Sequence, residues 1–153
     1  MNKRGMAPYF ASAGYTYHNA MAYSAKHNCA AYGGCGDSPK KIWRLNSDQS
    51  MTQMPDCPGN TQLGVQKGNL NVDPVTGNFL LLSAGQLWAL DPTGNGAWAQ
   101  QTGTRTPPAG VGIPGPSNPA GVISCELPQH KVLIYITQSS SNGGTTYLYK
   151  HAA

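Results

Sequence analysis

One pattern of strands and turns occurs three times along this chain. Each copy contains an apolar segment, a turn, a second apolar segment, and then a short strand that joins Ile or Leu to an aromatic residue. These short strands are found at Ile42–Leu45 and Leu87–Leu90, and the third copy ends in Leu148–His151. Repeats with a period of about 40–50 residues are typical of stacked or radial folds, because one unit cannot bury its own faces. The sequence therefore predicts a series of small β-sheets packed on one another.

The strand assignment is clearest in the second unit. Gly68–Val72 alternates apolar and polar residues, as a half-buried strand does. Asp73–Asn78 holds the residues that favour a tight turn, since Pro presets φ, Gly accepts a positive φ, and Asp and Asn bond the local backbone. Phe79–Leu82 is apolar at every position, so we expect both of its faces to be covered.

The same analysis extends over the whole chain and predicts an all-β protein. Nineteen glycines and twelve prolines lie between the apolar runs, as many short strands joined by turns require. We expect about eleven or twelve antiparallel strands in three sheets, with almost no helix. The remaining strands are expected at Tyr15–Tyr23, Cys29–Tyr32, Met51–Met54, Ala97–Gln100, Ala120–Cys125, Lys131–Thr137 and Thr145–Lys150, and a flexible tip at Ser139–Gly144.

Charge and hydropathy bear on partners and location. The net charge is +4, but the basic residues are scattered, so a nucleic-acid partner is not expected. No apolar run approaches the roughly 20 residues that span a bilayer, so no membrane partner is expected either. The N-terminus starts with a charged Met-Asn-Lys-Arg but lacks a signal-peptide apolar region. The sequence therefore does not define the compartment, and a secreted or extracytoplasmic location is compatible with it.

These residues resemble kelch-type, galactose-oxidase-like β-propeller repeats. The shared features are the strand that ends in Gly33-Gly34, the aromatic Trp43 after it, and Trp88 with Asp91-Pro92 and Trp98 in the second unit. The resemblance implies about three four-stranded blades, part of a larger ring, because propellers have four to eight blades. It places a single domain at residues 14–153, with blades at about 14–58, 64–101 and 119–151.

The resemblance implies a binding or assembly module more than an enzyme. Kelch-like propellers are mostly interaction platforms, with a protein or a carbohydrate as the ligand. The alternative is a fragment of a propeller enzyme, such as an oxidase or a carbohydrate-active protein. Fold alone does not decide between them.

Catalytic chemistry finds little support in the chain. The four histidines fall on different predicted layers, the six acids are largely explained by turns, and no GxSxG motif occurs. We therefore predict no catalytic residue, no metal site and no cofactor. Ligands of propellers usually meet loops between strands and blades, and the polar candidates there are Asp37, Lys40, Lys41, Asn60, Gln66, Lys67 and Arg105.

Three blades leave two apolar sheet faces open, and the third blade lacks an outer strand. We therefore predict self-association, most simply a twofold dimer that forms a six-bladed ring. The N-terminal segment, residues 1–13, is expected to supply a closing strand at Ala7–Ala13, to its own chain or to a partner.

The four cysteines allow one disulfide hypothesis. Cys29 and Cys35 bracket one predicted strand, so at about 3.3 Å per residue they lie roughly 20 Å apart. A disulfide spans at most about 7 Å between Cα atoms, which excludes that pair. Cys35 and Cys57 reach the same end of the first blade and are the expected pair, with free thiols as the alternative. Cys125 is expected to be free in either case.

Overall fold

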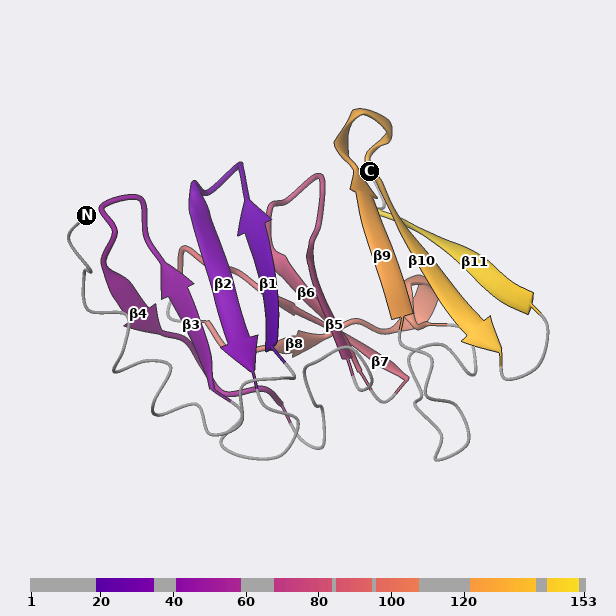
Figure 1. Ribbon diagram of the computed structural model, residues 1–153, viewed down its shortest axis with the longest axis horizontal. Coiled ribbons are helices and arrows are strands. Elements are labelled where there is room, and N and C mark those ends of the chain that lie inside the picture. The colour runs from indigo at the N-terminus through magenta and orange to yellow at the C-terminus, as the bar shows by residue number, and fades with distance from the viewer. Residues whose placement is uncertain are drawn as a thin grey trace.

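The described part of the chain is entirely antiparallel β-sheet apart from two short 3-10 turns. The computed structural model describes residues 19–34, 41–58, 68–83, 85–94, 96–107, 122–139 and 143–151. These residues form eleven strands in three sheets (Figure 1). The all-β prediction, with three small sheets and almost no helix, is therefore confirmed.

Each sheet is a meander in which consecutive strands are neighbours. Sheet 1 contains β1 (Asn19–Ser24), β2 (Cys29–Gly34), β3 (Ile42–Leu45) and β4 (Met51–Gln53). Sheet 2 contains β5 (Gly68–Val72), β6 (Phe79–Ser83), β7 (Gln86–Leu90) and β8 (Ala99–Gln100). Sheet 3 contains β9 (Val122–Leu127), β10 (Val132–Ser139) and β11 (Gly143–Lys150). The 3-10 turns are η1 (Gly103–Arg105) and η2 (Pro128–His130).

Two predicted boundaries were wrong in an informative way. The expected flexible tip at Ser139–Gly144 is narrower than predicted, because Ser139 pairs with Gly143 and Gln138 with Gly144; residues 140–142 lie outside the described residues. The fourth strand of sheet 2 is shorter than expected and begins at Ala99 rather than Ala97. The indole of Trp98 donates a hydrogen bond to the Pro55 carbonyl at 3.2 Å, so this segment binds sheet 1 instead of extending β8.

Strand β6 lies at the centre of the packing, as its uniformly apolar sequence predicted. All five of its residues are buried. Phe79 and Leu81 belong to a core cluster shared with sheet 1, whereas Leu80 and Leu82 belong to a second cluster shared with sheet 3. Successive strand residues point to opposite faces, so one strand supplies the core of both sheet–sheet contacts.

The sheets contact one another through their first strands. Strand β1 contacts β5, and β5 contacts β9. Figure 1 shows sheet 1, in purple, and sheet 3, in orange to yellow, on opposite sides of sheet 2. Sheets 1 and 3 therefore each have one face toward sheet 2 and one face turned away from it. The described residues contain no helix long and apolar enough to cross a membrane.

Candidate functional site

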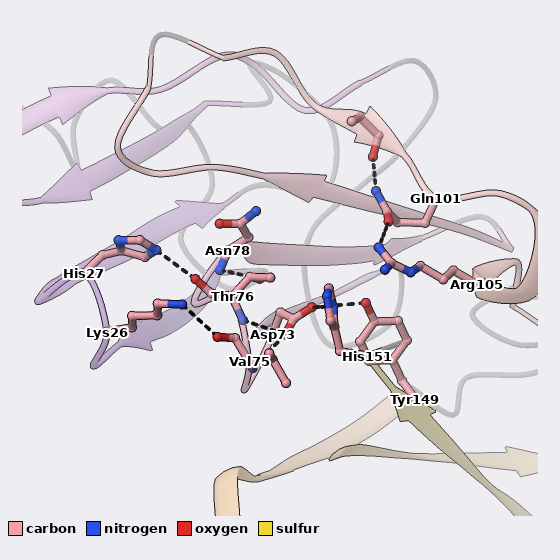
Figure 2. A network of polar contacts seen from close by, with 11 residues as sticks. Lys26, His27, Asp73, Val75, Thr76, Asn78, Gln101, Arg105, Tyr149 and His151 are labelled. Atoms are coloured by element: carbon pink, nitrogen blue, oxygen red, sulfur yellow. Dashed lines mark hydrogen bonds and ion pairs between the residues drawn. The ribbon is translucent and has the colours of Figure 1, made fainter. Parts of the chain in front are cut away.

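The turn that follows β5 connects sheet 2 to sheet 3 through Asp73. Its Oδ1 accepts hydrogen bonds from the backbone N–H groups of Val75 and Thr76 at 2.8 and 3.0 Å. Its Oδ2 lies 2.7 Å from Nδ1 of His151 and accepts a hydrogen bond from the Tyr149 hydroxyl at 3.2 Å. Figure 2 shows His151 and Tyr149 directed at this carboxylate from sheet 3. One buried carboxylate thus shapes its own turn and fixes the neighbouring sheet.

The environment of Asp73 favours the ionised carboxylate. Burial raises its pKa, but the two backbone N–H donors, followed by the hydrogen bond and charge of His151, outweigh burial and hold the pKa below its ordinary value. Burial and the adjacent Asp73 charge raise the pKa of Tyr149 to about 12, so the phenol stays protonated and donates. The ionised Asp73 therefore accepts the hydrogen bond that the protonated Tyr149 donates.

A second set of polar contacts joins β5 to β9. The backbone N–H of Val72 donates to Oε1 of Glu126 at 2.9 Å. The Ser124 hydroxyl lies 2.8 Å from Oδ1 of Asn69 and 2.5 Å from Oδ1 of Asn71. Burial raises the pKa of Glu126, and the Val72 N–H only partly opposes this. These contacts set the register of the first strand of sheet 3 against that of sheet 2.

The same turn binds sheet 1 on its other side. The Ser24 hydroxyl donates to the Gly77 carbonyl at 2.7 Å, and Lys26 Nζ donates to the Val75 carbonyl at 2.9 Å. Nε2 of His27 lies 3.0 Å from the Thr76 carbonyl, and Figure 2 shows Lys26 and His27 reaching this turn from the side opposite His151. The turn after β5 is therefore the junction of all three sheets.

Arg105 lies between two cavities beside this junction. The first, about 330 Å³, is lined by Arg105, by Tyr135, Tyr147 and Tyr149 of sheet 3, and by Lys150. The second, about 280 Å³, is lined by Arg105, Tyr149, Asp73 and His151. Nη1 of Arg105 donates to Oε1 of Gln101 at 3.1 Å (Figure 2), which holds the guanidinium at the wall of both cavities.

The structure separates the two predicted ligand residues that it describes. Arg105 lines both cavities, whereas Lys41 lines neither. Lys41 Nζ instead forms an exposed ion pair with Asp56 at 2.9 Å, so its amino group is already neutralised. The other predicted ligand residues lie outside the described residues: Asp37, Lys40, Asn60, Gln66 and Lys67.

The sequence did not single out Asp73, Tyr149 and His151 as a group. Asp73 was assigned to its turn, which the two backbone hydrogen bonds confirm, but its link to sheet 3 was missed. Among the described residues, no three His, Cys, Asp or Glu side chains are grouped to hold a metal ion. The hydrogen bonds of Asp73 to Tyr149 and His151 hold sheets 2 and 3 together.

The outward faces of sheets 1 and 3 carry large exposed apolar side chains. On sheet 1, Met21 is 71% and Tyr23 57% exposed, and they alternate with the core residues of β1. On sheet 3, Ile123 is 69% and Leu148 66% exposed, with Ile136 beside them. Soluble proteins rarely expose contiguous apolar patches of this kind unless they bind something there.

The cysteines are only partly described. The predicted Cys35–Cys57 disulfide includes Cys35, which lies outside the described residues, and Cys57 is buried. Cys29 is a buried free thiol whose pKa is raised by burial, and Cys125 is an exposed free thiol on the outward face of sheet 3. The expectation for Cys125 is thus met.

Comparison with known proteins assigns no family: no protein-family model, curated protein or solved structure matches the chain. The kelch-type resemblance therefore stays a hypothesis carried by the residues named above.

Proposed function

We propose that the chain is a non-catalytic β-propeller module that self-associates to complete a ring. In a propeller, antiparallel sheets pack face to face around an axis. The successive contacts of β1 with β5 and of β5 with β9 support this arrangement. So does the meander order within each sheet.

The observation that carries the proposal is the apolar character of both outward faces. Sheet 1 presents Met21, Tyr23 and Leu45, and sheet 3 presents Ile123, Ile136 and Leu148. Equivalent apolar residues on β6 are fully covered, because that sheet has a neighbour on each side. Both outward faces therefore resemble half of a sheet–sheet contact, and a second copy supplies the other half at each end.

The polar clusters favour a structural role over catalysis. Both oxygens of Asp73 already accept hydrogen bonds, and Glu126 accepts one from Val72. These acids link neighbouring sheets. We assign the binding role of the ring to the cavity beside Arg105, which three tyrosines and two cationic side chains line. A protein or a carbohydrate is the proposed ligand.

The open outer edge of sheet 3 is the place for a fourth strand. Strands β3 and β7 each pair with a fourth strand, β4 and β8. Within the described residues, β11 pairs only with β10, and its outer edge is eight residues long. A long open edge is a template for another strand. Ala7–Ala13 lies outside the described residues and is our candidate for this position, from the same chain or from its partner.

Sedimentation velocity over a range of protein concentrations tests the self-association. We expect a dimer of the 16.1 kDa chain. The double variant Ile123→Lys/Leu148→Lys should raise the dissociation constant of the dimer more than tenfold, since each side chain buried in the contact contributes about 1 kcal/mol or more. Gln100→Lys, an exposed change on β8, is the control and should leave the mass unchanged.

A wild-type chain that stays monomeric at every concentration would overturn the proposal. Deletion of residues 1–13 tests the closing strand separately. It should lower stability or change the mass in solution, and a truncated chain identical to wild type in both would exclude this closure.

A further inference from the structure

The two sheet–sheet contacts inside the chain follow one arrangement. In each, the turn between the first and second strands of one sheet lies against the end of the third strand of the next. His27, in the first turn, shares a small cavity with Pro92 and Thr93, which follow β7. Asp73, in the second such turn, binds His151, which follows β11. The rule predicts what the third such turn, η2 with Lys131, should meet.

The apolar residues repeat an arrangement as well. Where sheet 2 meets sheet 3, sheet 2 supplies aliphatic residues, Leu80, Leu82, Leu87 and Ala89, and sheet 3 supplies Leu133 with three tyrosines, Tyr135, Tyr147 and Tyr149. The outward face of sheet 3 is again aliphatic, with Ile123, Ile136 and Leu148. The outward face of sheet 1 combines aromatic residues with Met21 and Leu45: Tyr23 is exposed there, and Tyr32 and Trp43 pair on the same face. The outward face of sheet 3 is thus aliphatic, as is the face of sheet 2 that packs on sheet 3, and the outward face of sheet 1 carries the aromatic residues that could pack on it.

The charges at the two outward faces are complementary. Around the turn of sheet 3, His130, Lys131 and Lys150 are exposed. After β3 of sheet 1, the turn contains Asp48, whose Oδ1 accepts hydrogen bonds from the backbone and hydroxyl of Ser50. Lys131 and Asp48 therefore carry opposite charges at the turn and third-strand positions. The first turn of sheet 1 carries Lys26 and His27, which inside the chain bond the first turn of sheet 2.

We infer that a second copy of this chain binds head to tail, with the outward face of sheet 3 on the outward face of sheet 1, and with Lys131 opposite Asp48. This rests on the proposed function and adds the orientation and register of the partner. Pairing two sheet 1 faces would instead place Asp48 near Asp48 and aromatic residues on aromatic residues. Head-to-tail contact also allows two copies to close, because each supplies one face of each kind.

The register of the internal contacts also predicts which residues of β9 in one copy and β1 in the other lie against each other. The first hairpin turns differ in length, so positions are counted from the middle of each turn. On that count Cys125 in β9 corresponds to Asn71 in β5, and Met21 in β1 corresponds to Ser124 in β9. Asn71 and Ser124 touch, with Oδ1 and Oγ 2.5 Å apart. Cys125 of one copy should therefore lie against Met21 of the other.

A charge-exchange experiment tests the orientation. Asp48→Lys and Lys131→Glu are prepared as separate proteins, and each should dimerise at least tenfold more weakly than wild type. A one-to-one mixture should recover dimerisation, because both contacts of the mixed dimer again join opposite charges. Asp56→Lys is the control for the change in net charge, since Asp56 pairs with Lys41 at 2.9 Å.

A cross-linking experiment tests the register and does not depend on those charges. Met21→Cys should form an intermolecular disulfide with the native Cys125 under mild oxidation, seen as a dimer on a non-reducing gel. The same variant carrying Cys125→Ser should remain uncross-linked.

The outcomes separate the two proposals. Recovery in the mixture together with the cross-link supports the head-to-tail register. A wild-type dimer without the cross-link, or without recovery in the mixture, overturns the register and leaves self-association standing. A monomeric wild type overturns both.

Discussion

Removal of the Asp73 carboxylate should be among the most costly single changes in the chain. Its side chain is 3% exposed and accepts four hydrogen bonds, two from its own turn and two from sheet 3. Asp73→Ala leaves the N–H groups of Val75 and Thr76 without an acceptor, along with Tyr149 and His151. Each buried unsatisfied donor costs about 1–3 kcal/mol.

The total loss of stability is smaller than the sum of these four costs, because two of the donors can reach water. Tyr149 and His151 are only partly buried, whereas the turn N–H groups are held in place. We therefore expect a loss of about 3–5 kcal/mol for Asp73→Ala. With a urea dependence of about 2 kcal/mol/M, the unfolding midpoint should fall by about 2 M.

Asp91→Ala is the matched control for this measurement. Asp91 also precedes a proline, and its Oδ1 accepts hydrogen bonds from the backbone and hydroxyl of Thr93. It is exposed, and within the described part of the chain its hydrogen bonds stay in its own turn, so its loss should cost less than about 1 kcal/mol. Both variants are unfolded in urea at the same protein concentration, because association would shift the midpoint. Equal losses for the two variants would refute the inter-sheet role of Asp73.

A double-mutant cycle assigns the part that belongs to His151. Asp73→Asn keeps an oxygen for the turn, and His151→Ala removes the partner from sheet 3. The coupling energy between these two changes should be about 1–3 kcal/mol, as for contacting partners in one network. Additive losses would show that His151 is not held by Asp73.

Three further predictions follow from the same contacts. Because the pKa of Asp73 is lowered by folding, its contribution to stability is present above pH 3.8 and is lost as pH falls further, so the acid-induced loss should be smaller in Asp73→Asn than in wild type. Glu126→Gln keeps an acceptor without a buried charge, so it should raise the unfolding free energy at neutral pH, and the gain should shrink on acidification because burial raises the pKa of Glu126. Gly77→Ala should cost about 2 kcal/mol or more in urea unfolding, because φ is +77° and a Cβ would lie 2.8 Å from the His27 ring, whereas Gly94→Ala should be nearly neutral since its nearest neighbour would be at 3.5 Å.

Much of the fold follows from local sequence. Ile42–Leu45 and Gly68–Val72 form strands at the predicted residues, because alternation and turn residues act over a few positions. The covered faces of β6 also follow from its uninterrupted apolar run. The turn role of Asp73 was predictable for the same reason, since its N–H partners are two and three residues away.

The candidate site depends on contacts that local patterns do not encode. Asp73 and His151 are 78 residues apart in sequence, and only the order of the sheets brings them together. Lys41 was selected as a loop cation, yet an acid 15 residues later pairs with it. Arg105 was selected by the same rule and does line the cavities. Side-chain chemistry identifies candidates, but the topology decides which of them meet.

The distribution of apolar residues over the three sheets explains why association is expected at both ends. A sheet that ends a stack needs a polar outer face, as capping repeats have. Sheets 1 and 3 lack such a face, because Met21 and Tyr23 at one end and Ile123 and Leu148 at the other are more than half exposed. The two ends differ, because Tyr23 adds an aromatic ring beside Met21 at one end, whereas the exposed Ile123, Ile136 and Leu148 at the other end are all aliphatic. Repeated head-to-tail contacts form either an open filament or a closed ring. In the ring that we propose, two copies of three sheets give six, which lies within the four to eight blades over which propellers close, and closure would leave neither apolar face in water.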